Sequence, residues 1–371
     1  MNIVKLVFAF ILSIGQIIGP YIQIAVNGGI DSFFESWSET DEFKADYAFE
    51  IKKDPNKDFV ILNFADIQLS PDRVFGEDGE YSNRLIKKCV EEVKPDLITL
   101  TGDNSSSDVG YLELIKLLDS FEIPWAVVMG NHDGNNGDKT KEGWDSYILS
   151  HAKNCLFKFG PSEMGYGNYI INITENGKIV HSLIMMDTHS DADDTEYGKI
   201  NYGKNEDGTD SIGYDHVWTK QIKWYKWAVN GINKLAGNNV ESSLFFHIPL
   251  YEYNEARDLY CNEVKDKDGN TEYVLKDEYK DLYFGSLKEG ICSPNGNNGF
   301  FNEILRLNST KNVIVGHDHV NSLCVEYKGV WLNYGLKSGH GSYWNADVMG
   351  ASVLTIGSDG HGVFSHHYYS E

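Results

Sequence analysis

The chain has 371 residues, and its hydrophobic content of 41% is enough to build a substantial buried core, which argues against a largely disordered protein. It carries 32 lysines and arginines against 55 aspartates and glutamates, giving a formal net charge of -23 at pH 7. This charge repels the phosphate backbone of nucleic acids, and the sequence shows no local basic groove, so we expect no nucleic-acid partner.

The first 30 residues predict a signal peptide or a membrane anchor. One basic residue, Lys5, precedes a mostly apolar run from Leu6 to Val26, and an acidic segment begins at Asp31. The run is long enough to span a bilayer, although Pro20 and several polar residues interrupt it. A buried N-terminal helix is the alternative. On the favoured interpretation the protein is secreted or membrane-anchored, it associates with membranes through its N-terminus, and the rest of the chain lies outside the cytoplasm.

The five cysteines include no C-x-x-C pair, which argues against a zinc ribbon and against a thioredoxin-like redox motif. Cys261 and Cys292 flank an expected insertion and can form a disulfide if the protein is exported. Buried free thiols are an equal alternative, and the sequence leaves both open.

The main domain is expected at residues 58–371, where strands and helices begin to alternate. Residues 59–64 are an apolar, β-branched run that predicts a buried strand leading into a polar loop. Further strands are predicted by similar runs, and they lie at 97–101, 125–129, 169–173, 180–186, 243–246, 312–315, 330–334 and 351–356. Apolar residues at helical spacing predict helices at 82–93, at 111–118 and from Val217.

Two insertions are also expected. The long polar stretch 190–215 is a candidate lid or substrate-facing segment, because loops of this length in a compact domain are usually functional. Residues 260–275 predict an exposed hairpin that turns at Asp268-Gly269.

Five polar loops follow predicted strands directly, at the edge where ligands gather in sheets of this kind. They are Asp66-Ile67-Gln68, Gly102-Asp103-Asn104, Gly130-Asn131-His132-Asp133, His247 and Gly316-His317-Asp318-His319. Imidazole, carboxylate and amide groups together suit zinc, iron or manganese. Two such ions about 4 Å apart can activate a bridging water and hold the attacking and leaving oxygens of a displacement at phosphorus. We therefore expect a metal centre where the five loops meet.

The five loops resemble the ordered motifs of the calcineurin-like metallophosphoesterase superfamily, which are D-x-H, G-D, G-N-H-(D/E), a lone His and G-H-x-H. The resemblance spans residues 59–356 and places a domain of this family at residues 58–371. It implies an α/β fold of two packed β-sheets flanked by helices, the four-layer metallophosphoesterase sandwich. Three stretches are similar to the purple-acid-phosphatase-like, Dcr2-like subgroup, namely residues 100–104, 246–253 and 299–301.

The resemblance implies that two metal ions, of manganese, zinc or iron, activate a hydroxide that hydrolyses a small phosphate ester. Phosphomonoesters are the expected substrates. The ligands that it implies are Asp66, Gln68 and His319 for one ion, Asp103 as the bridge, and Asn131, His247 and His317 for the second ion. His132 would be the catalytic residue, donating a proton to the leaving oxygen or stabilising charge on the phosphoryl group. Asp133 and Asp318 would shape their loops.

Two positions depart from the family pattern. Gln68 stands where the family has the histidine of D-x-H, and an amide oxygen is a weaker ligand than imidazole, so the first site is expected to be weaker or changed in metal preference. Ser106 stands where purple acid phosphatases place a metal-bound tyrosine, so no tyrosinate–iron centre is expected. Two alternatives remain open: a phosphodiesterase of the same fold, and an anchored binding protein with impaired catalysis.

Overall fold

The computed structural model describes residues 34–70, 74–133, 151–192, 213–265, 267 and 271–370. The predicted signal or anchor segment and residues 193–212 of the predicted lid lie outside these ranges. Within them, no helix combines the length and the hydrophobicity that crossing a membrane requires.

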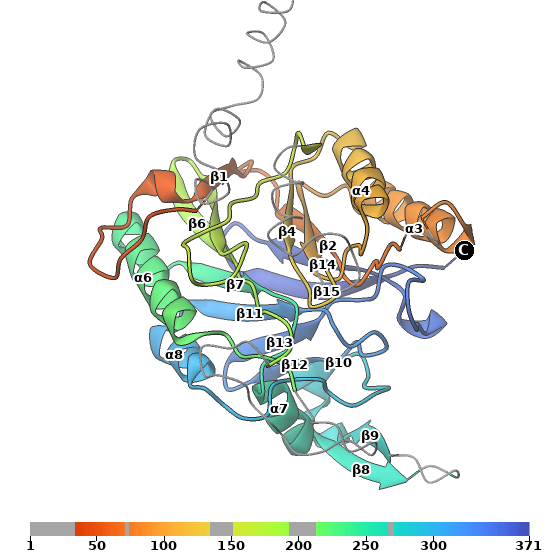
Figure 1. The fold of residues 1–371 in the computed structure, drawn as a ribbon. Coiled ribbons are helices and arrows are strands. Elements are labelled where there is room, and N and C mark those ends of the chain that lie inside the picture. Colours follow the sequence, from red (N-terminus) through yellow and green to blue (C-terminus); the bar gives the residue numbers. More distant parts are fainter. Residues whose placement is uncertain are drawn as a thin grey trace, which may run out of the picture.

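The first large sheet has five strands, in the order β15-β14-β2-β3-β4. The strands are β2 (Phe59–Phe64), β3 (Leu97–Thr101), β4 (Trp125–Val128), β14 (Gly350–Ile356) and β15 (Gly362–Tyr368). The central strands β2, β3 and β4 are parallel, because helices α3 (Glu77–Val93) and α4 (Asp108–Ser120) carry the chain back between them (Figure 1). Their carboxyl ends therefore lie at one edge of the sheet.

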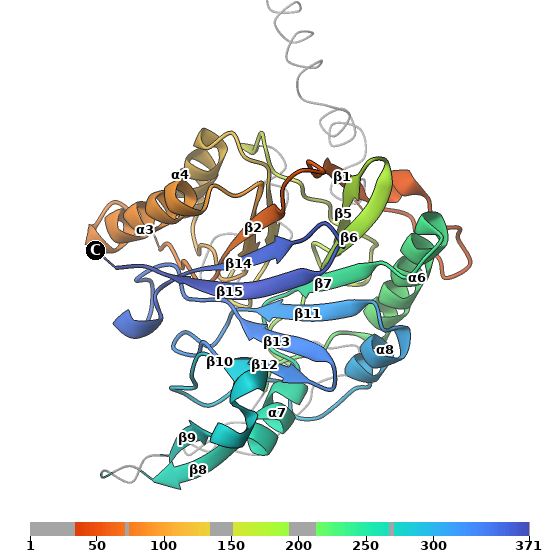
Figure 2. The ribbon, with the colours of Figure 1, turned by 180° about the vertical axis from the view of Figure 1, so that it is seen from behind.

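The second large sheet has eight strands, in the order β1-β5-β6-β7-β11-β13-β12-β10. Its strands are β1 (Phe49–Lys52), β5 (Tyr169–Glu175), β6 (Lys178–Met185), β7 (Glu241–Phe245), β10 (Tyr283–Phe284), β11 (Thr310–Val315), β12 (Cys324–Tyr327) and β13 (Val330–Tyr334). Strands β6, β7, β11 and β13 are parallel neighbours. Figure 2 shows α6 (Thr219–Ala236) and α8 (Phe300–Leu307) beside this sheet.

The remaining elements are short. Helix α7 (Glu252–Tyr260) follows β7 and leads into the antiparallel strands β8 (Cys261–Lys265) and β9 (Thr271–Leu275). They confirm the pairing predicted at 260–275, while the predicted turn at Asp268-Gly269 lies outside the described residues. The 3₁₀ helices are η2 (Ala45–Tyr47), η3 (Asp277–Leu282) and η4 (Ala346–Val348).

Alternate residues of β5 reach two different hydrophobic cores. Ile171 joins the core that holds β2, β3, α3 and α4, whereas its neighbour Ile170 joins the core that holds α6 and α8. Both side chains are fully buried, so the eight-stranded sheet is covered on both faces. The layers are therefore helices, sheet, sheet and helices, and the predicted α/β sandwich of two packed sheets is confirmed.

All five cysteines are free thiols in this fold. A disulfide between Cys261 and Cys292, which the sequence left open, is therefore not formed. Cys261 is buried at the start of β8. Cys292 lies near Asp318, to which its backbone N–H donates.

Candidate metal centre

Carboxyl ends of strands from both sheets meet at the candidate site. Asp66, Asp103 and Asn131 follow β2, β3 and β4 of the five-stranded sheet. His247 follows β7, and His317 follows β11, of the eight-stranded sheet. Main-chain contacts hold the two groups of loops together: the His317 N–H donates to both carboxylate oxygens of Asp66, at 3.0 and 3.2 Å.

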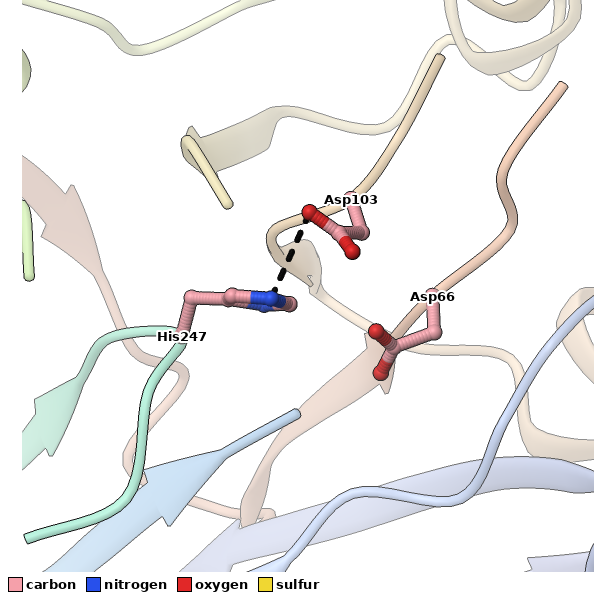
Figure 3. Close-up of side chains that lie close together, drawn as sticks. All are labelled: Asp66, Asp103 and His247. Atoms are coloured by element: carbon pink, nitrogen blue, oxygen red, sulfur yellow. Dashed lines mark ion pairs between the residues drawn. The ribbon is translucent and has the colours of Figure 1, made fainter. Parts of the chain in front are cut away.

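Asp66, Asp103 and His247 form a cluster in which one ligand atom of each lies within 4.8 Å of the others (Figure 3). Each is no more than 1% exposed. The His247 Nε2 atom lies 3.3 Å from the Asp103 Oδ1 atom, the pair marked by the dashed line in Figure 3. Two buried carboxylates beside an imidazole are a donor set that a divalent cation would stabilise.

His247 Nε2 is the centre of a second group of potential ligand atoms. Asn131 Oδ1 lies 3.0 Å away, and both His317 Nδ1 and Asp103 Oδ1 lie 3.3 Å away. Metal–ligand bonds of about 2.0–2.2 Å place adjacent ligand atoms about 3.0–3.5 Å apart in tetrahedral or octahedral geometry. Each of the three separations from His247 Nε2 therefore falls within the range expected between neighbouring ligands of one ion.

The two histidines of this group are prepared for ligation. His247 Nδ1 donates to the carbonyl oxygen of Thr101 at 2.8 Å, which orients the ring so that Nε2 faces the other ligands. His317 Nε2 is buried and has no hydrogen-bond partner among the described residues. A buried nitrogen without a partner costs free energy, which contact with a bound substrate would offset while Nδ1 faces the other ligand atoms.

The other predicted ligands lie together on the opposite side of Asp103. His319 Nε2 is 3.6 Å from Asp66 Oδ1 and 3.2 Å from Gln68 Nε2. Gln68 Nε2 also lies 2.9 Å from Asp103 Oδ2. The structure thus brings together all seven residues to which the resemblance assigns metal binding, while their roles as ligands stay predictions.

Burial and neighbouring charges shift the ionisation of these groups in the metal-free protein. Burial raises the pKa of Asp66 to about 7. Burial also opposes ionisation of Asp103, but the adjacent His247 and His132 outweigh it, and the pKa of Asp103 is lowered. Conversely, Asp103 and Asp66 overcome the burial of His247 and raise its pKa to about 9. A positive charge at this position is strongly favoured, whether it is an imidazolium or a bound cation.

Two glycines of the motifs are required by close packing around these ligands. A Cβ atom on Gly130 would lie 2.1 Å from Asp103 Oδ1, and one on Gly102 would lie 2.5 Å from His247 Nδ1. Gly102 also has a φ of +90°, which side chains other than glycine rarely adopt. The glycines of G-D and G-N-H are therefore explained by the space that the ligands occupy.

Four predicted ligands have left-handed backbone conformations, with φ of 52° at Asp66, 50° at Gln68, 52° at Asp103 and 80° at His317. Such angles are uncommon outside glycine, and each costs free energy. The turns at the strand ends use these angles to direct the side chains toward one another.

His132 differs from the ligands around it because its side chain is exposed. Its backbone N–H donates to Asp103 Oδ1 at 2.8 Å, which fixes the main chain next to the ligands. The main chain of His132 is therefore held beside the ligands, while its side chain is accessible to a molecule that binds there from solvent.

Asp133 holds two loops of the site in place and is itself fully buried. Its carboxylate accepts hydrogen bonds from the backbone N–H groups of Asn104, Ser105 and Gly130 and from the Tyr111 hydroxyl at 2.6 Å. Burial raises the pKa of this carboxyl group, while these donors act in the opposite direction. The loop-shaping role predicted for Asp133 agrees with these contacts.

Sequence reasoning missed Lys337, which is 2% exposed and lies directly beside the site. Its Nζ atom donates to the backbone oxygen of Asp66 at 2.8 Å and to Gln68 Oε1 at 3.3 Å. Lys337 follows β13 just as the predicted ligands follow their strands. That position is the signal in the sequence, but an ammonium group has no lone pair for a metal, so Lys337 does not match the chemistry of the other loop residues.

The comparisons with known proteins agree with the geometry. The family model of calcineurin-like phosphoesterases matches residues 59–321. The chain belongs to this family. The match includes every predicted site residue from Asp66 to His319, and it confirms the resemblance seen in the motifs.

Two curated relatives of this calcineurin-like phosphoesterase show moderate sequence identity, and the matches cover only part of their own length. "Probable inactive purple acid phosphatase 14" of Arabidopsis thaliana is 27% identical over 70% of this chain and 62% of its own length. "Phosphatase DCR2" of Saccharomyces cerevisiae is 31% identical over 67% of this chain and 41% of its own length. The matches thus span less than two thirds of either relative. Among solved structures, a dimetal phosphatase from Danio rerio is 13% identical, with a TM-score of 0.47 over 84% of this chain and 99% of its own.

Proposed function

We propose that this calcineurin-like phosphoesterase hydrolyses small phosphate esters in a metal-dependent reaction, with phosphomonoesters preferred to diesters. The proposal rests chiefly on His247 Nε2, around which three other potential ligand atoms lie at 3.0–3.3 Å. Family membership supports the reaction class, and the similarity to a yeast phosphatase supports the preference for monoesters.

One metal ion would be held by Asp103, Asn131, His247 and His317. Manganese, zinc and iron all suit this set of imidazole, carboxylate and amide donors. When bound, the ion would supply a Lewis acid that activates water and withdraws charge from the phosphoryl oxygens. The chain itself orients the ligands, through the contact between His247 and the Thr101 carbonyl and through the loops that Asp133 fixes.

His132 would act on the leaving group. Its imidazole is exposed while its backbone is held by Asp103, so it can approach the ester oxygen of a bound substrate. Donation of a proton from the imidazole to that oxygen would prevent the build-up of negative charge on the departing alcohol. General acid catalysis of this kind contributes about 10²–10⁴-fold to a rate.

His132→Ala tests this assignment. With an aryl phosphate and added manganese, zinc or iron, we expect kcat to fall at least about a hundredfold, while the metal content of the protein stays unchanged. His361→Ala is the matched control, because His361 is also exposed but pairs with Glu241, and it should retain wild-type activity. Equal activity of His132→Ala and the wild type would rule out the catalytic role.

A binding protein without turnover is the second candidate. It is favoured by Gln68 at a position where the family has histidine, and by the word "inactive" in the name of the Arabidopsis relative. The same assay separates the two candidates. Wild-type protein that binds metal but turns over neither an aryl monoester nor an aryl diester would support the binding protein and overturn the enzyme.

We also propose that residues 1–30 direct the protein out of the cytoplasm, either as a signal peptide or as a membrane anchor. The apolar run after Lys5 supports this proposal. The full chain expressed in cells should appear in the medium or the membrane fraction, and a chain that starts at residue 31 should stay in the cytosol. Equal distribution of the two proteins would contradict the proposal.

A further inference from the structure

The Gln68 side chain lies between two predicted ligands of the first ion and donates to both. Its Nε2 atom is 2.9 Å from Asp103 Oδ2 and 3.2 Å from His319 Nε2. His319 Nδ1 lies 3.1 Å from the carbonyl oxygen of Tyr343, which can only accept, so Nδ1 carries the proton and Nε2 presents a lone pair. Both hydrogens of the amide are therefore directed at lone pairs that a metal would need.

Charged neighbours fix the orientation of this amide at both of its ends. Lys337 Nζ can only donate, and it lies 3.3 Å from Gln68 Oε1. The Asp103 carboxylate, when ionised, can only accept, and it faces Nε2. Turning the amide to direct Oε1 at a metal would bring its NH₂ group against the ammonium of Lys337, where two donors repel each other. The orientation that would let Gln68 ligate a metal is thus the disfavoured one.

Lys337 is held beside the site by the main chain. It forms an isolated parallel bridge with Ala65, and the adjacent Ser338 N–H donates to the Ala65 carbonyl oxygen at 2.8 Å. Nearby Gly341 packs directly on the Gln68 backbone, since a Cβ atom on Gly341 would lie 2.2 Å from the backbone oxygen of Gln68. The ammonium is therefore a fixed positive charge next to the first site, and it would repel a metal cation there.

We propose that this chain binds one metal ion tightly instead of two, because Gln68 and Lys337 close the first site. Gln68 donates hydrogen bonds where a metal would accept electron pairs, and Lys337 supplies a positive charge in its place. The single ion is held by Asp103, Asn131, His247 and His317. This inference rests on the metal centre of the proposed function and deepens it, since it sets the number of ions with which any reaction must proceed.

Counting ions on the full-length wild-type protein tests the inference without any assay of activity. Metal-free protein is dialysed against Mn²⁺ and analysed for bound metal, and its electron paramagnetic resonance spectrum is recorded. We expect one tightly bound Mn²⁺ per chain with the spectrum of an isolated ion. Two tightly bound ions with a spin-coupled spectrum would overturn the inference and leave the proposed function standing. Protein that binds no ion would overturn both.

Two variants test the assignment to Gln68 and Lys337. Gln68→Glu keeps the size of the side chain, lets Lys337 donate to one oxygen, and turns the second oxygen toward Asp103 and His319. Lys337→Met removes the fixed charge and frees the amide to turn. In each variant we expect a second Mn²⁺ to bind at least about tenfold more tightly than to the wild type.

Lys53→Met is the matched control, because Lys53 is also a buried lysine but pairs with Glu175 at the edge of the eight-stranded sheet. It should bind one ion, as the wild type does. If neither Gln68→Glu nor Lys337→Met improves binding of a second ion, these two residues are not what closes the first site, and the inference fails.

Discussion

Replacing Asp103 by asparagine is expected to lower phosphatase activity at least about a hundredfold and to weaken metal binding. The reason is that both oxygens of Asp103 are engaged. Oδ1 accepts from the His132 N–H at 2.8 Å and lies 3.3 Å from His247 Nε2, while Oδ2 accepts from Gln68 at 2.9 Å. An asparagine has only one oxygen, so its NH₂ group must face either the His132 N–H or the Gln68 amide, and both of these are donors.

The measurement is kcat/KM on an aryl phosphate, together with metal analysis of the same preparations. Asp46→Asn, at an exposed aspartate in η2, is the control and should behave as the wild type does. Circular dichroism of the two variants separates loss of the site from loss of the fold. An Asp103→Asn protein with wild-type activity and metal content would show that Asp103 is not a ligand.

The second large effect is on stability. Asp133→Ala should lower the free energy of unfolding by about 3–5 kcal/mol, because it leaves three backbone N–H groups in a buried site without their acceptor. Tyr111→Phe removes the hydroxyl group, which donates to Asp133 at 2.6 Å and also contacts the Met129 sulfur at 3.4 Å, and should lower the free energy of unfolding by about 1.5–3 kcal/mol.

Urea unfolding of the metal-free proteins measures both losses without a contribution from metal binding. The order of the two variants matters more than either value. An Asp133→Ala protein at least as stable as Tyr111→Phe would mean that water or a shifted side chain takes over the three donors, and that Asp133 does not hold the loops.

Several strands that lead to the site were predictable because they are largely buried and mostly apolar. The predicted strands at 59–64, 97–101 and 330–334 agree with β2, β3 and β13 at both ends. The turn between β5 and β6 was also predicted correctly, since Asn176 and Gly177 both adopt the positive φ that this dipeptide favours.

Helix starts were predicted less well. Helix α3 begins at Glu77, five residues before the predicted position, because its first turn is acidic and exposed and so adds nothing to the apolar spacing. Helix α4 begins at Asp108, where the Ser107 hydroxyl accepts from the Gly110 N–H at 3.1 Å. Acidic first turns and a serine cap are both recognisable signals, but neither is hydrophobic.

Strands β1, β10, β12 and β15 were not predicted. Strand β15 alternates buried and exposed residues but ends in the polar sequence Ser365-His366-His367-Tyr368, so its apolar pattern is too short to identify. Strand β1 is only partly buried and pairs in parallel with β5, which lies over 100 residues away in the chain. Pairing over such a separation depends on the assembled sheet and not on local sequence.

The candidate site, like the fold, was predicted only in part. Residue types and their order identified seven potential ligands, and the described part of the chain brings all seven together. The residues that surround Gln68 could not be predicted from the sequence. Its contact with Lys337 joins residues 269 positions apart, and it depends on the bridge between Ala65 and Lys337, which forms only in the assembled fold.

The left-handed backbone at Asp66, Gln68, Asp103 and His317 sets the geometry of the site against the stability of the fold. Each such residue costs about 1–3 kcal/mol, and glycine would remove most of that backbone strain. The same replacement would delete the side chain that the strained turn directs into the site. The strain is therefore a cost that the fold bears at the positions where these carboxylate, amide and imidazole groups are brought together.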